Sequence, residues 1–518
     1  MGPCRFQTEQ DPPSMSLALV HSRAQTGVHA QEVRVEVHLA GGLPAVSIVG
    51  LPDAAVRESR DRVRAALQCS QLELPQRRIT INLAPADVPK DGSRFDLPIA
   101  LGILAASGQL PREALRDREF HGELALTGEL RPIEGALPAV LAAARAGRDI
   151  VLPMDNRAEA SLANHPGTRF ARSLLEVCAL LQNGRELPGP EAAPIHGDHS
   201  TEGPDLSEVR GQPHARRALE VAAAGAHNML MVGPPGSGKS MLAQRLPTLL
   251  PPLPDAQALE CAAIASLCGR MPDFTNWRAP PYRAPHHTAT AVALTGGGGA
   301  ANLRPGEISL AHHGVLFLDE LPEWQRHTLE VLREPLESGR IVISRAARQA
   351  EFPSRFQLIA AMNPCPCGWA GDPAGRCHCS REQIDRYRAR ISGPLLDRID
   401  IQIAVPRIAS ADMRPDAPRG ETSAQVRARV ERARALQQAR AGVSNAALSQ
   451  AQTERDCSLD ERDRSLLERA IDQLHLSARA SQRILRVART IADLAGSEAI
   501  ATAHLAEAIG YRRLDARS

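Results

Sequence analysis

The chain has 518 residues, which is long for a single hydrophobic core, so we expect about two to four domains. Its 61 basic and 59 acidic residues leave a net charge of +2, so the chain has no overall attraction to nucleic acids or membranes, and any polyanion must bind a local patch. The sequence shows no run of about twenty apolar residues and no basic segment followed by an apolar one at its start. We therefore expect neither a membrane span nor a signal peptide, and we predict a cytoplasmic protein.

The first part of the sequence predicts one α/β or α+β domain. Residues 1–14 are polar and contain prolines, and Met15 opens the patterned segment, so we expect either a flexible extension or a misplaced initiation codon there. Over residues 15–185, β-like segments such as "EVRVEVHLA" alternate with helical segments such as "ALPAVLAAARAG". Residues 186–205 are rich in proline, glycine and charged residues, which indicates a linker.

The second part predicts a parallel α/β core that is followed by helices. Within residues 206–407, the apolar segments "NMLMV", "GVLFL" and "FQLIAAM" each lead into a polar turn, which is typical of buried strands that end at a functional site. Residues 408–423 form a second polar linker, and residues 424–518 are almost wholly helical by periodicity.

A phosphate-binding loop follows the first of these strands. The stretch "GPPGSGKS" matches the pattern G-x-x-x-x-G-K-[ST] and stands between an apolar strand and a helical segment. We expect its backbone N–H groups to bind the phosphates of ATP, Lys239 to reach the β- and γ-phosphates, and Ser240 to bind Mg²⁺. The predicted ATP-binding residues are Gly233, Pro234, Pro235, Gly236, Ser237, Gly238, Lys239, Ser240 and Asp319.

Lysine usage supports this assignment independently. Only two of the 61 basic residues are lysines, Lys90 and Lys239. Because a compact ammonium and a planar guanidinium are not interchangeable, a chain that uses arginine elsewhere is expected to keep lysine where an ammonium is required. For Lys90, chance is an equally good explanation.

Two carboxylates and an amide end the second and third strands. Asp319 is expected to hold Mg²⁺ and Glu320 to polarise the attacking water. Asn363 stands where a group that positions this water would be needed. At this point the sequence resembles the AAA+ ATPases, with Asn363 in the sensor-1 position.

The resemblance to AAA+ ATPases also implies roles for two arginines. The segment "ISGPLLDRIDI" is similar to the arginine-finger segment of magnesium-chelatase and minichromosome-maintenance ATPases, so Arg398 would act on the γ-phosphate of a neighbouring subunit. Arg479, in "LSARASQRILRVART", stands at the sensor-2 position of a helical lid. For both arginines the alternative is a surface salt bridge. A finger that acts on a neighbour implies a ring, which would be an ATP-stabilised homo-hexamer.

The segments "YRAPHHTATAVALTGGGG" and "RPGEISLAHHGVLFLDELPEW" resemble the magnesium-chelatase-like branch of AAA+ proteins, and within it the ComM/YifB family, over residues 15–515. This resemblance implies an ATP-driven branch-migration helicase associated with natural transformation, which binds branched or single-stranded DNA without sequence specificity. The alternatives are a metal-chelatase motor and an ATPase that remodels an unknown client.

The first domain resembles the Lon-protease (ribosomal S5 domain 2-like) fold that is shared with the C-terminal domain of RadA, which raises the alternative of an ATP-dependent peptidase. Where Lon has its catalytic serine and lysine, this sequence has Arg94 and Leu137, with Ser93 one residue early. Peptidase chemistry needs both groups, so we expect a binding platform instead, in which Lys90 is a candidate phosphate contact.

Four of the ten cysteines lie in the stretch "CPCGWAGDPAGRCHC", directly after Asn363. The cysteines are Cys365, Cys367, Cys377 and Cys379. Four thiolates suit a structural Zn²⁺, although one intervening residue within each pair is tight, and His378 is an alternative ligand. A reduced, merely packed cluster and a redox function are the other two hypotheses.

Two insertions are candidates for DNA contact. Residues 337–357 predict a β-hairpin, at whose tip Arg345 and Arg348 would bind the DNA backbone, unless the hairpin only packs subunits together. Residues 284–307 resemble a glycine-rich insert of the same branch that would suit a mobile pore loop. Within this insert, His286 and His287 could be metal ligands. Because no third ligand lies nearby in the sequence, we expect a structural or pore role for them instead.

Overall fold

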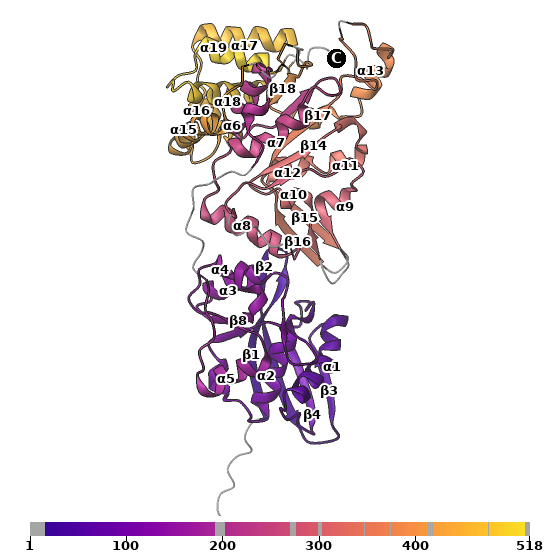
Figure 1. Ribbon diagram of the computed structural model, residues 1–518, viewed down its shortest axis with the longest axis vertical. Coiled ribbons are helices and arrows are strands. Elements are labelled where there is room, and N and C mark those ends of the chain that lie inside the picture. Colours follow the sequence, from indigo (N-terminus) through magenta and orange to yellow (C-terminus); the bar gives the residue numbers. More distant parts are fainter. Residues whose placement is uncertain are drawn as a thin grey trace, which may run out of the picture. The chain divides into compact units, whose positions relative to one another are not determined.

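The computed structural model (Figure 1) describes residues 16–191, 203–269, 276–298, 303–345, 348–372, 374–409, 411, 412, 414, 416, 418–474 and 476–512. The expected extension over residues 1–14 lies outside these ranges, as does most of the expected linker over residues 186–205. The chain forms two compact units. The N-terminal unit takes the described residues within 1–195, 265–275 and 298–303, and the C-terminal unit takes the rest. No helix among the described residues is both long enough and apolar enough to cross a bilayer.

The N-terminal unit is built on a seven-stranded mixed sheet with the strand order β3-β4-β2-β1-β5-β8-β9. Its strands are β1 (Leu17–Thr26), β2 (His29–Ala40), β3 (Ala45–Val49), β4 (Arg78–Ala84), β5 (Arg118–Phe120), β8 (Asp149–Pro153) and β9 (Thr168–Ala171). Strand β2 is antiparallel to both β1 and β4, whereas β3 with β4, and β1, β5, β8 and β9 with one another, pair in parallel. A small hairpin joins β6 (Glu123–Leu124) to β7 (Leu130–Arg131).

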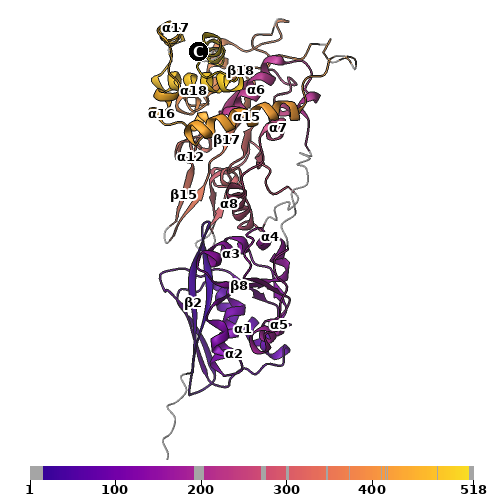
Figure 2. The ribbon, with the colours of Figure 1, turned by 90° about the vertical axis from the view of Figure 1, so that its left-hand side faces the viewer.

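Helices cover the two faces of this sheet. They are α1 (Ala54–Cys69), α2 (Asp96–Ala106), α3 (Ala136–Arg145), α4 (Arg157–Ser161) and α5 (Leu174–Asn183). Successive residues of β8 alternate between two hydrophobic clusters: Ile150 and Leu152 join the cluster of α3 and α4, and Val151 joins that of α1, α2 and α5. Figure 2 shows α1, α2 and α5 together on one side of β2. The alternation of strands and helices that the sequence predicts is therefore confirmed.

The C-terminal unit contains a five-stranded sheet in the order β11-β14-β17-β10-β18, in which every pair of neighbours is parallel. The strands are β10 (Met229–Val232), β11 (Tyr282–Arg283), β14 (Val315–Leu318), β17 (Gln357–Met362) and β18 (Ile401–Ala404). All residues of β14 and β17 are buried, as expected for parallel strands with helices on both faces. The parallel core predicted from the apolar segments is confirmed.

Helices surround this sheet and continue beyond it. They are α6 (Pro213–Gly225), α7 (Lys239–Leu249), α8 (Asp255–Ser266), α9 (Ala291–Thr295), α10 (Glu307–Leu310), α11 (Arg326–Glu330), α12 (Arg333–Ser338), α13 (Arg381–Arg388), α14 (Gly393–Leu396), α15 (Ser423–Ala441), α16 (Gln450–Asp456), α17 (Glu461–Leu474), α18 (Ala478–Leu494) and α19 (Thr502–Gly510). Short 3₁₀ helices lie at Ser93–Phe95, Arg112–Leu115, Met154–Asn156, Leu206–Glu208, Leu321–Glu323 and Asn445–Ala447.

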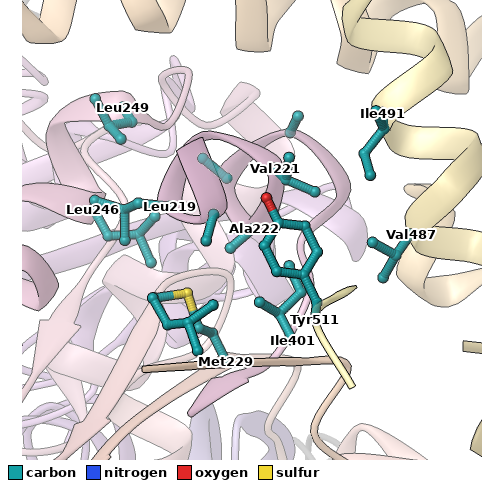
Figure 3. Close-up of a cluster of buried hydrophobic side chains, with 14 of the residues drawn as sticks. Leu219, Val221, Ala222, Met229, Leu246, Leu249, Ile401, Val487, Ile491 and Tyr511 are labelled. Atoms are coloured by element: carbon teal, nitrogen blue, oxygen red, sulfur yellow. The ribbon is translucent and has the colours of Figure 1, made fainter. Parts of the chain in front are cut away.

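One hydrophobic core joins the sheet to the helices that follow it. Side chains of α18 such as Val487 and Ile491 belong to the same buried cluster as Met229 of β10 and Ile401 of β18. Figure 3 shows Val487 and Ile491 directed toward Val221 of α6 and Tyr511. The helices α15 to α19, coloured orange to yellow in Figure 1, gather beside α6.

Two antiparallel hairpins extend the C-terminal unit. Strand β15 (Arg340–Arg345) pairs with β16 (Arg348–Pro353), and the short β12 (Gly296–Gly297) pairs with β13 (Arg304–Pro305). The first of these is the hairpin predicted over residues 337–357.

Candidate functional site: a phosphate-binding loop at the edge of a parallel sheet

The candidate nucleotide site lies where three neighbouring strands end. Gly233 follows β10, Asp319 follows β14 and Asn363 follows β17. These strands are adjacent and parallel, so their carboxyl ends meet at one edge of the sheet, where ligands of such sheets bind. The N–H of Gly233 donates to the carbonyl oxygen of Met362 over 3.1 Å, which ties the start of the loop to the end of β17. The structure thus brings together groups that lie up to 130 positions apart in the sequence (233 and 363).

The loop leads from β10 into α7 in a conformation that suits a bound phosphate. Gly236 and Gly238 have φ angles of +73° and +87°, in the left-handed region that favours glycine. Gly238 is the N-cap of α7, an 11-residue helix that begins at Lys239. Free N–H groups and the positive end of the helix dipole at such a terminus attract an anion.

Lys239 lies within this loop and is only 8% exposed. Its Nζ donates to the carbonyl oxygens of Gly233 (2.7 Å) and Pro234 (3.1 Å) and to Oδ1 of Asn363 (3.2 Å). Burial lowers the pKa of Lys239 below its ordinary value, while the nearby carboxylates of Asp319 and Glu320 act in the opposite direction. The ammonium is therefore held between the loop and the end of β17, in reach of a phosphate that enters the loop.

The residues expected to hold Mg²⁺ lie side by side. The hydroxyl of Ser240 donates to Oδ2 of Asp319 over 2.5 Å. A hydroxyl and a carboxylate are hard oxygen ligands of the kind that Mg²⁺ prefers, so the pair fits this ion. Asp319 is itself fixed, since its Oδ1 accepts the N–H of Glu320 (2.8 Å) and its carbonyl oxygen accepts Nε1–H of Trp324 (3.0 Å).

Glu320 has a partner that the sequence did not reveal. Nδ1 of His287 lies 3.0 Å from Oε2 of Glu320, whose side chain is 51% exposed. The chain reaches this place because β11 pairs in parallel with β14, so the residues after Arg283 pass the end of β14. Neither His286 nor His287 belongs to a group of metal-ligating side chains among the described residues, and the metal-binding alternative gains no support. The only sequence signal for the contact of His287 with Glu320 is that the two histidines come soon after a strand.

The structure places the two predicted arginines at different sites. The side chain of Arg398 is 7% exposed, and its NH2 lies 2.5 Å from Oε1 of Glu337. Its NH1 donates to the carbonyl oxygen of Pro394 over 2.6 Å. Arg479 is exposed in the first turn of α18. Both expected roles concern a bound nucleotide or a neighbouring subunit, and both stay predictions.

The four clustered cysteines converge on one point. Their Sγ atoms all lie within 4.8 Å of one another. The separations are 3.3 Å for Cys365 and Cys367, 3.8 Å for Cys365 and Cys377, and 3.7 Å for Cys367 and Cys377. Four sulfurs about 2.3 Å from a tetrahedral Zn²⁺ would lie about 3.8 Å apart, so the donor set and its spacing fit this ion. The chain between the pairs brings them together, and the one-residue spacing holds Cys365 and Cys367 closer than this separation.

The loop that carries the cysteines packs on the phosphate-binding loop. A Cβ built at Gly368 would stand 2.6 Å from Cδ of Pro235, so the backbone of Gly368 approaches the proline ring as closely as glycine permits. The N–H of Gly368 donates to the carbonyl oxygen of Cys365 over 3.0 Å. The shape of the cysteine loop therefore bears directly on the phosphate-binding loop.

A second group of metal-ligating side chains consists of Glu260, His312 and His313. The Nε2 atoms of His312 and His313 lie 3.0 Å and 2.9 Å from Oε2 of Glu260. Nδ1 of His312 accepts the backbone N–H of Arg355 over 3.0 Å, so the proton of the neutral ring is on Nε2 and points at Glu260. Burial lowers the pKa of His312 to about 4, which keeps the ring neutral. In this tautomer Nε2 of His312 carries a proton, so His312 donates to Glu260 and offers no lone pair to a metal.

The hairpin expected to contact DNA has its predicted strands. Arg345 pairs with Arg348 at the last rung of β15 and β16. Residues 346 and 347 lie outside the described residues. The backbone thus places both arginines at the end of the hairpin, and their contact with DNA stays a prediction.

In the N-terminal unit, the structure offers no serine–lysine pair among the described residues. Ser93 donates to the carboxylate of Glu123, Leu137 is fully buried, and Arg94 NH2 donates to the carbonyl oxygen of Glu134 over 2.8 Å. Lys90 is 0% exposed and its Nζ donates to the carbonyl oxygen of Pro85. Its ammonium is turned inward, so the idea that Lys90 contacts phosphate is wrong for this structure.

In this parallel sheet the phosphate-binding loop follows β10, the acid pair follows β14, and a polar residue follows β17, the strand between them. This arrangement defines a P-loop ATPase of the AAA+ class. The family models that match are "Magnesium chelatase, subunit ChlI" over residues 205–413, "Subunit ChlI of Mg-chelatase" over residues 35–156 and "Magnesium chelatase, subunit ChlI C-terminal" over residues 420–512.

Comparison with curated proteins shows to which family within the AAA+ class the chain belongs. The "Competence protein ComM" of Haemophilus influenzae is 51% identical over 506 residues, which cover 96% of this chain and 98% of that protein. The "Uncharacterized protein YifB" of Escherichia coli is 48% identical over 501 residues, covering 97% of this chain and 98% of that protein. The chain belongs to the ComM/YifB family of magnesium-chelatase-like ATPases. A "Lon protease" of Trichlorobacter lovleyi is 23% identical over 165 residues, or 30% of this chain, which gives the Lon-like fold only weak support.

Proposed function

We propose that the protein is an ATP-driven DNA motor that works as a homo-hexameric ring and moves branches in recombination intermediates during natural transformation. The observation that supports ATP hydrolysis is the convergence of Lys239, Ser240, Asp319 and Glu320 at one edge of the parallel sheet. The link to transformation is supported by membership of a family whose Haemophilus influenzae protein is named a competence protein.

In this proposal each side chain of the site has one task. ATP phosphates displace the carbonyl partners of Lys239, whose ammonium then neutralises their charge. Ser240 and Asp319 would hold Mg²⁺, which supplies charge stabilisation at the phosphates when bound. Glu320 takes the proton of the attacking water, and Asn363 fixes the position of that water.

The ring is supported by the arginine-finger assignment of Arg398. Its guanidinium pairs with Glu337 in the single chain, so we propose that it leaves this partner when a neighbouring subunit presents a nucleotide. Arg479, which is exposed at the start of α18, is proposed to contact the nucleotide as the helices close over it.

DNA contact is proposed for Arg345 and Arg348. Changing both to alanine should reduce the stimulation of hydrolysis by DNA and slow branch migration sharply. The salt dependence of DNA affinity should flatten by roughly one unit of log-log slope for each lost phosphate contact. The assay compares hydrolysis without DNA and with single-stranded, duplex and branched DNA, and measures affinity over a salt series.

A matched control replaces Arg462 and Arg464, two exposed arginines of α17, and should respond to DNA as the wild type does. Normal remodelling of branched DNA by the Arg345 and Arg348 variant would show that this hairpin does not hold the strand. A wild type that neither binds DNA nor hydrolyses ATP faster in its presence would contradict the motor and leave an ATPase that acts on an unknown client.

We further propose that Cys365, Cys367, Cys377 and Cys379 bind one structural Zn²⁺, because their sulfur separations suit tetrahedral zinc. Protein purified without chelator should contain about one zinc per chain by elemental analysis. Changing Cys365 and Cys377 to serine should remove the metal and weaken ATP binding, since the loop packs on Pro235. Changing the exposed Cys69 to serine should do neither. A wild type without any transition metal would refute the zinc site.

A further inference from the structure

We propose that a pocket in the C-terminal unit binds a phosphate monoester, the group that is carried by a free mononucleotide and by the phosphorylated end of a DNA strand. The pocket has a volume of about 470 Å³, and sites for small ligands typically measure about 300–1,000 Å³. Its lining includes Pro322, Glu323, Trp324, Arg326, Arg386 and Arg390. These residues lie outside the phosphate-binding loop and outside the hairpin of β15 and β16, so the pocket is a site separate from both.

The charge of this pocket suits a monoester. Its lining carries three guanidinium groups and a single carboxylate, which leaves a net charge of +2. Arg326 begins α11, Arg386 lies in the last turn of α13, and Arg390 follows that helix. A phosphate monoester carries about −1.5 to −2 charges at pH 7, whereas a carboxylate or a phosphodiester carries about −1. The planar fork of arginine also matches pairs of phosphate oxygens, so a monoester balances the pocket best.

Two of these arginines have donors to spare. Among the described residues, neither Arg326 nor Arg386 forms a hydrogen bond or an ion pair through its guanidinium, and both residues are exposed. Glu330, four residues after Arg326 in α11, is paired with Arg333 over 2.7 Å. A ligand can therefore take the donors of Arg326 and Arg386 without breaking an existing contact.

The third arginine is oriented before a ligand arrives. NH1 of Arg390 donates to the carbonyl oxygen of Pro322 (3.2 Å) and to Oε2 of Glu323 (3.1 Å). Its guanidinium carbon lies 6.0 Å from the centre of the Tyr387 ring. Because a guanidinium has five N–H donors, Arg390 keeps donors for a phosphate while Glu323 holds it in place. Glu323 is thus the partner of Arg390 and not itself a phosphate contact.

One wall of the pocket is fixed by the turn after β14. Nε1 of Trp324 donates to the carbonyl oxygen of Asp319 over 3.0 Å, and the N–H of Glu323 donates to the carbonyl oxygen of Glu320 over 2.7 Å. A wall that is formed in advance reduces the ordering that binding requires. Trp324 is only 3% exposed, so its ring offers little surface on which a base could stack. Binding should therefore depend on the phosphate and not on the base.

Equilibrium dialysis of the full chain with radiolabelled thymidine monophosphate tests the pocket directly. A double variant with Arg326→Ala and Arg386→Ala should bind this probe roughly 10-fold or more weakly than the wild type, since two charge-assisted contacts are lost at an exposed site. Thymidine, which lacks the phosphate, should show no such difference. Arg381→Ala is the matched control and should bind like the wild type, because its side chain also belongs to α13 but is 92% exposed and lies 4.0 Å from Asp385.

Two further measurements identify the site and the source of the phosphate. Lys239→Ala, which alters the ATP site, should leave the binding of thymidine monophosphate unchanged. A single strand with a 5′-phosphate is compared with the same strand with a 5′-hydroxyl, and the double variant should lose any preference for the phosphate. A phosphorylated strand that binds more tightly than thymidine monophosphate identifies a strand end as the source, and equal affinities identify a free nucleotide. Either result supports the pocket.

Equal affinity of the wild type and the double variant for thymidine monophosphate would overturn the proposal, as would an equal loss in Arg381→Ala or in Lys239→Ala. Loss of assembly in the double variant with unchanged probe binding would overturn it too, and would show that the arginines hold an acidic side chain of a second copy. The double variant should keep the thermal unfolding of the wild type, because it removes no hydrogen bond among the described residues. A wild type that ignores DNA contradicts the DNA motor, whereas dialysis with thymidine monophosphate still decides the pocket.

Discussion

Glu320→Gln should lower ATP turnover by roughly 100- to 10,000-fold and leave ATP binding near the wild-type level. The amide has the size of the carboxylate but cannot accept a proton from water at neutral pH. Binding should survive because the phosphates are held by the loop and Lys239, whereas Glu320 contacts His287 and is half exposed. Single-turnover hydrolysis and the affinity for a fluorescent ATP analogue measure the two effects separately.

A matched control for this change is Glu323→Gln, three residues further along the chain. Glu323 lies 3.1 Å from Arg390 at the surface, and its side chain is 43% exposed. A surface pair of this kind contributes little, so turnover should stay near the wild-type rate. Wild-type turnover in Glu320→Gln would show that Glu320 is not the general base of the reaction.

Lys239→Ala should weaken ATP affinity by roughly 100-fold or more. Charge-assisted hydrogen bonds to phosphate oxygens contribute about 1.5–3 kcal/mol each, and the role proposed for Lys239 gives it at least one to each of two phosphates. The loss should therefore appear in the dissociation constant of the nucleotide, measured by fluorescence titration, before any effect on the chemical step.

Lys239→Arg tests whether charge alone is enough. The ammonium occupies a space bounded by two carbonyl oxygens and the amide of Asn363, and it is only 8% exposed. A planar guanidinium is larger and spreads its donors in one plane, so it should also bind ATP poorly. Wild-type affinity in either variant would contradict the assignment of the loop as the nucleotide site.

The parts of the site that the sequence predicted are those that depend on local order. Asp319 and Asn363 stand at the ends of fully buried, mostly apolar strands, and parallel strands in one sheet place such ends together. The phosphate-binding loop is continuous in sequence, so its pattern alone identified Lys239 and Ser240. The cysteine cluster was visible for the same reason, since all four residues lie within fifteen positions.

The parts that the sequence could not predict depend on which distant segments meet. The contact of His287 with Glu320 requires β11 to pair beside β14, and nothing in either segment specifies that neighbour. The same holds for the pairing of Arg398 with Glu337, 61 positions apart (337 and 398), and for the inward direction of Lys90. That the described residues 265–269, 298 and 303 count with the N-terminal unit was equally hidden, because they lie inside the stretch 206–407 that the sequence assigns to the second part.

The scarcity of lysine gives the chain an unusual chemical handle. Lys90 is 0% exposed and Lys239 is 8% exposed, so we expect an amine-directed label to reach Lys239 before Lys90. Burial lowers the pKa of both lysines and so raises the fraction of free amine in each, but only Lys239 keeps an exposed fraction. A nucleotide in the loop would cover this amine. Acylation of a single residue, followed by mass spectrometry of one peptide, would thus read the occupancy of the ATP site directly, even in a mixture of assembled and free subunits.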